Sequence, residues 1–328
     1  MKGGEGTRIA RSDPSLPLPE LEILDGFRLI GAWSERDALG ERAHLEGEVA
    51  FGYLDAEWSL PRDAAHVDVT LRYRKRATLA KEAAYIAFPI ALAEARVLSD
   101  SQLGWIDWDR DRLPGACVEW LPLQTAVRLE TDDAAVALAS PDVPLFCAGD
   151  IVRGTWADSA RIRGGRIFSY LLNNYWHTNY RAEQSGDIVV RYRLMSDRAI
   201  DAARAHRFGW EARRPLYGQR ISFQEFREPA PPYDARGTIT LASVEPDGVA
   251  LSTLVAARHE DGWIARLQEI AGERQTATIR FDGLRVARAW RVDHLEREIA
   301  ELAVGESGEL RVPIEPWQLA TVRFVVAR

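Results

Sequence analysis

The sequence is poor in the residues that build disulfide frameworks and metal cages. It has two cysteines in 328 residues, Cys117 and Cys147, which excludes a disulfide framework and favours two free thiols. The six histidines have no close metal-binding spacing, and the Cys-x-x-Cys and His-Glu-x-x-His motifs are absent. No stretch approaches the roughly 18 apolar residues of a membrane helix, and no signal peptide is visible at the start. These absences predict a cytoplasmic chain that is not inserted in a membrane.

Several enzyme and binding signatures are also missing. The chain has no Gly-x-Gly-x-x-Gly loop, no phosphate-binding Gly-Lys-Ser/Thr loop and no Gly-x-Ser-x-Gly elbow. Its formal net charge is −7, with Arg residues scattered along the sequence. Nothing in this pattern favours nucleic acid as a partner.

What the sequence does have is alternation of apolar and polar residues with a period of two, which is typical of half-buried strands. Turn residues such as Pro246-Asp247-Gly248 separate these runs. The pattern predicts an all-β fold. The clearest expected strands are 67–74, 126–129, 135–138, 188–192, 238–241 and 321–324. One helix is expected over 196–205, and 292–299 is either a helical turn or a strand that leads into a loop.

The Pro-rich stretch at 226–237 is the expected domain boundary. We therefore expect a flexible lead over 1–25, a large β-sandwich over 26–225, a linker over 226–237 and a small C-terminal β-sandwich over 238–328.

The chain has eleven tryptophans, which suit either an aromatic β-sandwich core or a cleft that stacks on sugar rings. The most unusual window is 166–180, where an apolar strand turns abruptly polar and aromatic. Amides can bind vicinal hydroxyls as donor and acceptor, and aromatic rings can stack on a pyranose. The alternative is a structural hydrogen-bond network at a strand end. The candidates for a cleft or a domain interface are Asn173, Asn174, Tyr175, Trp176, His177 and Asn179.

Two other segments combine carboxylates with tryptophan. Asp111 lies in the acidic and aromatic run 105–115, and Glu119 is followed directly by Trp120. These carboxylates could hold sugar hydroxyls, and a buried Glu119 could act as an acid or base. They could equally be solvated charges on a loop and on the outward face of a strand.

Five segments together resemble a known family. Residues 168–180 (FSYLLNNYWHTNY) resemble the C-terminal region of bacterial glycoside hydrolase family 38 proteins, the α-mannosidases. Residues 81–89 (KEAAYIAFP), 113–120 (LPGACVEW), 137–145 (ALASPDVPL) and 264–272 (IARLQEIAG) are similar to that family in the same order. The resemblance covers roughly residues 45 to 328.

The resemblance implies a large antiparallel β supersandwich, similar to galactose mutarotase, followed by a smaller β-sandwich. In the family, the carboxylates and the zinc-type ion that hydrolyse α-mannosides belong to an N-terminal half. None of its three motifs occurs here, so the resemblance implies no catalytic residue, metal ligand or cofactor in this chain.

Three functions follow from these observations. The first is a carbohydrate-associated β region of an α-mannosidase-like enzyme, not catalytic alone, whose partners are a mannoside-type glycan and either a separate catalytic chain or a second copy. The second is a stand-alone mutarotase-like epimerase or lyase that uses His177 with Glu119 or Asp111. The third is a purely structural or oligomerisation module.

Overall fold

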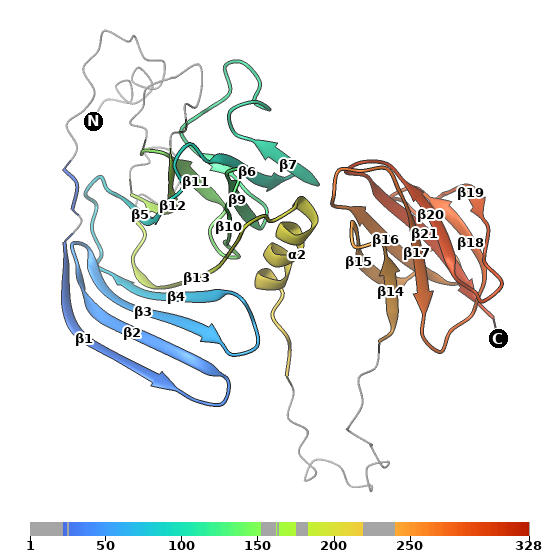
Figure 1. Cartoon of the computed structure of the whole chain (residues 1–328), viewed down its shortest axis with the longest axis horizontal. Helices are drawn as coiled ribbons and strands as arrows, with labels where there is room; N and C mark the ends of the chain where they lie inside the picture. Colours follow the sequence, from blue (N-terminus) through green and yellow to red (C-terminus); the bar gives the residue numbers. More distant parts are fainter. Residues whose placement is uncertain are drawn as a thin grey trace, which may run out of the picture. The chain divides into compact units, whose positions relative to one another are not determined.

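In a computed structural model, described over residues 22–24, 26–151, 162, 164–174, 183–218 and 240–327, the chain forms two compact units that divide between Arg213 and Arg214. Figure 1 shows both units, which consist almost entirely of strands. Every strand pair named below is antiparallel. The expected lead lies mostly outside the described residues, and the expected linker at 226–237 lies wholly outside them. No helix in the described part of the chain is long and apolar enough to cross a membrane.

The N-terminal unit contains two sheets. In sheet order, the nine strands of the larger are β1 (Phe27–Arg36), β2 (Gly40–Val49), β3 (Gly52–Pro61), β4 (Val67–Lys75), β13 (Gly186–Asp197), β10 (Ala135–Ala139), β9 (Ala126–Glu130), β6 (Arg96–Ser101) and β7 (Gly104–Asp107). The four strands of the smaller are β5 (Ala83–Ile90), β12 (Gly165–Asn173), β11 (Leu145–Ala148) and β8 (Leu121–Pro122).

The two sheets of this unit share one apolar core. Leu129 and Leu138 of the larger sheet and Phe146 and Ile167 of the smaller sheet are completely buried in it. Alternation along each strand sends these side chains inward and sends their neighbours to the opposite face. The core therefore fixes which side chains of the smaller sheet point away from it, and these form the candidate site.

The helix α2 (Ala202–Arg213) contacts β9 and β10. Strand β10 turns small residues, Ala135, Ala137 and Ala139, toward a second buried cluster that includes Phe208 of the helix. A side chain at Gly209 would collide with Thr125. Small residues on both elements thus allow the helix to approach the sheet closely.

The expected helix at 196–205 is wrong in its start. Ser196 and Asp197 still pair with β10, so the strand continues where capping residues favoured a helix. The backbone N–H of Arg204 donates to Asp201 Oδ1 at 2.7 Å, which makes Asp201 the capping residue of a helix that begins at Ala202. The helix also continues beyond the expected end at residue 205 and ends at Arg213.

The C-terminal unit is a sandwich of two further sheets with its own core. Leu267, Ile279, Val312 and Val322 are buried between them. The three-stranded sheet has the order β14 (Ala242–Glu245), β17 (Gln275–Phe281) and β20 (Leu310–Ile314). The five-stranded sheet has the order β15 (Val249–Ala256), β16 (Trp263–Glu269), β21 (Leu319–Val326), β18 (Val286–Val292) and β19 (Glu298–Leu302).

These sheets confirm the predicted fold class, an all-β chain with a large antiparallel region followed by a smaller β-sandwich. The expected strands at 67–74, 126–129, 135–138, 188–192 and 321–324 are present as β4, β9, β10, β13 and β21. Of the strand expected at 238–241, residues 238 and 239 lie outside the described residues, and 240 and 241 precede β14, which begins at Ala242 where pairing with Phe281 of β17 starts. Residues 292–299 contain the end of β18 and the start of β19.

Candidate functional site

An aromatic cluster lies on the face of the smaller N-terminal sheet that points away from the core. Tyr85 of β5 and Tyr170 of β12 are direct partners across the two strands, and their rings stack with centroids 4.8 Å apart. Their neighbours Ile86 and Ser169 turn inward instead. Because side chains alternate along a strand, the two tyrosines must share the outer face.

Trp120 completes this aromatic cluster from the segment just before β8. Its ring stacks on Tyr170 at a centroid distance of 5.7 Å, and its indole N–H donates to the Tyr85 hydroxyl at 3.4 Å. The three side chains are each partly exposed. Tyr85, Trp120 and Tyr170 therefore present a partly open aromatic surface with polar atoms at its margin, the kind of surface that stacks on a sugar ring.

Glu119 lies beside this aromatic cluster and is buried, with 9% of its surface exposed. Its carboxyl group has no hydrogen-bond or ion-pair partner in the described part of the chain. Burial raises its pKa above the ordinary value of 4.5. A raised pKa favours the neutral acid, which can both donate and accept a hydrogen bond.

Among the described residues, burial is the one cause that shifts the pKa of Glu119. Burial raises the pKa of Tyr85 to about 12, and the Glu119 carboxylate adds a smaller rise. Burial likewise raises the pKa of the Cys147 thiol to about 12, again with a contribution from Glu119. Cys147 is therefore an inert buried thiol at neutral pH.

Asn174 takes part in a hydrogen-bond network within the chain. Its Nδ2 donates to the Thr78 carbonyl at 3.1 Å and to Glu82 Oε1 at 3.2 Å, and its Oδ1 accepts the Gln184 N–H at 3.1 Å. The side chain is almost fully buried. The backbone N–H of the neighbouring Asn173, at the half-buried end of β12, donates to Gln184 Oε1 at 3.1 Å. The contacts of Asn174 thus match the alternative interpretation, a structural hydrogen-bond network at the end of a strand.

The other candidates of this window are Tyr175, Trp176, His177 and Asn179, and all four lie outside the described residues. Their placement near a sugar or at a domain interface stays a prediction. The same holds for any pairing of His177 with Glu119 or Asp111.

Asp111 is exposed and is engaged in a turn. Its Oδ2 accepts the backbone N–H of Asp107 at 2.8 Å, and the buried Asp107 carboxylate in turn accepts from Arg96 Nε at 2.7 Å. This arrangement matches a capped loop of solvated charges. Of the candidates Asp111, Glu119 and Trp120, the last two lie at the aromatic cluster and Asp111 does not.

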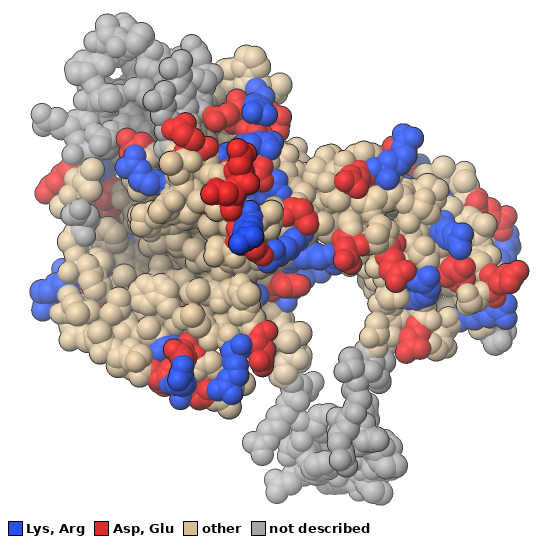
Figure 2. Space-filling model, viewed as in Figure 1, with Lys and Arg blue, Asp and Glu red and all other residues tan. Residues whose placement is uncertain are grey.

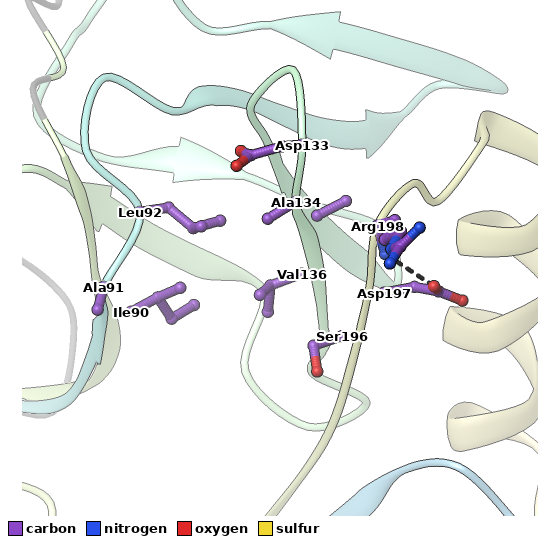
Figure 3. A pocket seen from close by; sticks show the side chains of 10 residues that line it. Ile90, Ala91, Leu92, Asp133, Ala134, Val136, Ser196, Asp197 and Arg198 are labelled. Atoms are coloured by element: carbon purple, nitrogen blue, oxygen red, sulfur yellow. Dashed lines mark hydrogen bonds between the residues drawn. The ribbon is translucent and has the colours of Figure 1, made fainter.

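A separate hollow of about 440 Å³ lies where β5 ends, β10 begins and β13 ends. Figure 3 shows Ile90, Leu92 and Val136 around its floor, with Asp133 and Asp197 beside it. Asp197 pairs with Arg204 at 2.6 Å, and Asp133 accepts from the Thr131 hydroxyl at 2.9 Å. Both carboxylates are therefore already engaged, and the hollow contains none of the predicted site residues.

The distribution of charged and metal-binding side chains indicates no further site in the described part of the chain. On the face shown in Figure 2, acidic and basic side chains are mixed, which gives no surface of one sign to attract a polyanion. Within the described ranges, no group of three or more His, Cys, Asp or Glu side chains could hold a metal ion.

The sequence indicated Glu119 and Trp120 as candidate site residues, but it did not indicate Tyr85 and Tyr170 individually. A signal for both existed, since each tyrosine alternates with core residues along its strand. What the sequence could not supply was the register that places Tyr85 opposite Tyr170.

The fold and the site define a multi-sheet β protein with a partly exposed aromatic surface on its smaller N-terminal sheet. Residues 248–322 match the family described as glycosyl hydrolases family 38 C-terminal beta sandwich domain. The C-terminal unit therefore carries that domain, and the resemblance to the C-terminal β region of family 38 is confirmed. No curated protein matches the sequence.

Two structures from Enterococcus faecalis share the fold of this chain over 90% of its length. An alpha-mannosidase from strain V583 aligns with a TM-score of 0.62 at 9% identity, over 90% of this chain and 35% of its own. A protein in glycosyl hydrolase family 38 aligns with a TM-score of 0.61 at 10% identity, over 90% of this chain and 36% of its own. The chain thus spans about a third of the length of these proteins.

Proposed function

We propose that this chain is the C-terminal, carbohydrate-associated β region of an α-mannosidase-like glycoside hydrolase. In this proposal the chain lies in the cytoplasm, is not catalytic alone, and needs a catalytic domain for α-mannoside hydrolysis. The observation that carries the proposal is the family 38 C-terminal domain at residues 248–322. A fold shared with about a third of an alpha-mannosidase supports it.

Within this function, the aromatic cluster of Tyr85, Trp120 and Tyr170 is the proposed contact to a mannoside-type glycan. Stacked rings offer a flat apolar surface to the C–H face of a sugar. The Glu119 carboxyl group offers hydrogen-bonding oxygen atoms to vicinal hydroxyls. The chain contributes no metal or cofactor in this proposal, and the reaction chemistry belongs to a catalytic domain on the same or a separate polypeptide.

The first test is an assay of the purified chain on an aryl α-mannoside with added zinc, cobalt or manganese. We expect no turnover by the chain alone, and turnover on co-expression with a family 38 catalytic domain with which it co-purifies. Metal-dependent turnover by the chain alone would overturn the proposal, as would the absence of any association with the catalytic domain.

The second test is binding of mannose oligosaccharides, measured by titration calorimetry and on a glycan array. We expect Trp120→Ala and Tyr170→Ala to weaken binding at least tenfold, since stacking on an aromatic ring is lost. Trp263→Ala is the matched control, because Trp263 is 41% exposed on the C-terminal unit. Equal binding by all three variants, or none by the native chain, would remove the glycan contact from the proposal.

A further inference from the structure

The first strand of the larger sheet has an unusually open edge. β1 is the outermost strand, is ten residues long and pairs only with β2 among the described residues. Nine of its ten residues are exposed, and Figure 1 shows the strand at the margin of the sheet. An unpaired strand edge presents a row of free backbone donors and acceptors to another strand.

The middle of this strand is apolar. Leu29 and Ile30 are each 54% exposed and Trp33 is 47% exposed, with no charged residue between Arg28 and Glu35. Natural edges are usually protected by charge, proline or a short strand. β1 has charges only toward its ends, so its centre is suited to cover by another strand.

The charges near the two ends of β1 are complementary to each other. Arg28 lies opposite Glu48 of β2, and Glu35 lies opposite Arg42. Arg28 and Glu35 pair with these residues at 2.8 Å and 2.6 Å, so both belong to the charged outer face of the sheet. If β1 meets a copy of itself in the antiparallel direction, each Arg28 comes opposite the other Glu35.

The irregularity in β1 fits the same symmetric pairing. The register with β2 shifts between Leu29 and Gly31, which leaves Ile30 as an extra residue. If a two-fold axis passes through Ala32, Trp33 of each strand lies opposite both Ile30 and Gly31 of the other strand. Two residues on one strand then face one residue on its partner, which is the arrangement of a β-bulge. Leu29 then lies opposite Ser34 on the opposite face from the charges.

We propose that β1 pairs antiparallel with β1 of a second copy of this chain, about a two-fold axis at Ala32. The two nine-stranded sheets become one continuous sheet, and the contact is isologous. Its occupant is a second copy, because the strand is complementary to itself in charge and in bulge position. This inference is independent of the proposed function.

The first experiment measures the molar mass of the full chain in solution by light scattering during gel filtration. We expect a species of twice the 36.8 kDa of one chain that dissociates on dilution. Arg28→Glu and Glu35→Arg should each give monomers, since each brings like charges together. The double variant should dimerise again, and a mixture of the two single variants should form a heterodimer.

The matched control is Arg166→Glu, an exposed charge reversal on the smaller sheet, which should leave the dimer intact. A native chain that stays monomeric at its solubility limit would overturn the proposal. So would a dimer that withstands both single reversals, or a double variant that stays monomeric. Near-ultraviolet circular dichroism of each variant separates lost pairing from lost folding.

A cross-link tests the position of the axis. In a Cys117→Ser background, Ala32→Cys should oxidise to a covalent dimer, because the two Ala32 residues face each other at the axis and cross-strand partners lie within disulfide reach. Glu41→Cys on β2 is the control and should stay unlinked. Cross-linking of the control but not of the Ala32→Cys variant would overturn this register.

Discussion

Glu119 is a predicted site residue that the structure buries, with 9% of its surface exposed. It interacts with Tyr85 and with the buried Cys147 thiol, and burial raises its pKa with no opposing cation in the described part of the chain. The sequence indicated this residue through its neighbour Trp120, but the charge state depends on Tyr85 and on Cys147, which come from other strands. A single sequence could therefore predict which carboxylate to examine but not that it would be buried without a partner.

This burial predicts a pH-dependent stability. The native protein holds the Glu119 proton more tightly than the unfolded chain, whose carboxyl titrates near 4.5. Stability from this group is thus fully present below pH 4.5 and is lost as the pH rises through the native pKa. Glu119→Gln cannot ionise, so at pH 7 we expect it to be more stable than the native chain.

The measurement is urea denaturation at pH 4 and pH 7. The difference in unfolding free energy should nearly vanish at pH 4. Glu211→Gln, on the exposed surface of α2, serves as the control and should show no difference at either pH. A gap of equal size at both pH values would mean that ionisation of Glu119 is not its cause.

At the scale of elements, the ends of β4, β5 and β12 are held together by polar groups. The Lys75 side chain at the end of β4 is fully buried and forms an ion pair with Glu82, which lies just before β5. Glu82 also accepts from Asn174, just after β12. The sequence predicted β4 from its alternation of apolar and polar residues. The contact of the Lys75–Glu82 pair with Asn174, which is 92 residues from Glu82 in the chain, could not be predicted from local patterns. Neither could the start of α2, where strand pairing overrides local capping.

This network predicts a strongly coupled pair. Glu82→Gln should lower the free energy of unfolding by about 3–5 kcal/mol, because it leaves the fully buried Lys75 ammonium group without its counter-charge. Lys75→Met should cost less, because the Glu82 side chain that it leaves is 26% exposed and keeps its hydrogen bond from Asn174. The double variant should lose clearly less than the sum of the two, since neither charge remains. Urea denaturation of the full cycle measures this coupling.

The control for this cycle is an exposed ion pair between β4 and its neighbour β13. Arg74 and Asp187 form an ion pair at 2.9 Å with both side chains 75% exposed. Arg74→Met should therefore change stability by less than about 1 kcal/mol. Additive losses in the Lys75 and Glu82 cycle would show that the two side chains act separately.

At the scale of the whole molecule, the two units have separate cores. The cluster around Leu138 contains only residues of the N-terminal unit, and the cluster around Leu267 contains only residues of the C-terminal unit. The sequence predicted two β-sandwiches from its turn spacing and from the proline-rich stretch. The division of the larger one into a nine-stranded and a four-stranded sheet required long-range pairings such as β4 with β13, which local patterns do not encode.

Separate cores predict two unfolding transitions, because each unit can lose its packing without exposing the other core. Leu138→Ala and Leu267→Ala each remove a fully buried side chain, which should cost about 2–5 kcal/mol in the affected unit only. In calorimetry, each variant should lower the temperature of one transition and leave the other in place. Leu295→Ala, at a residue 65% exposed, should move neither. If both core variants instead shifted a single transition equally, the two units would have to unfold as one cooperative body.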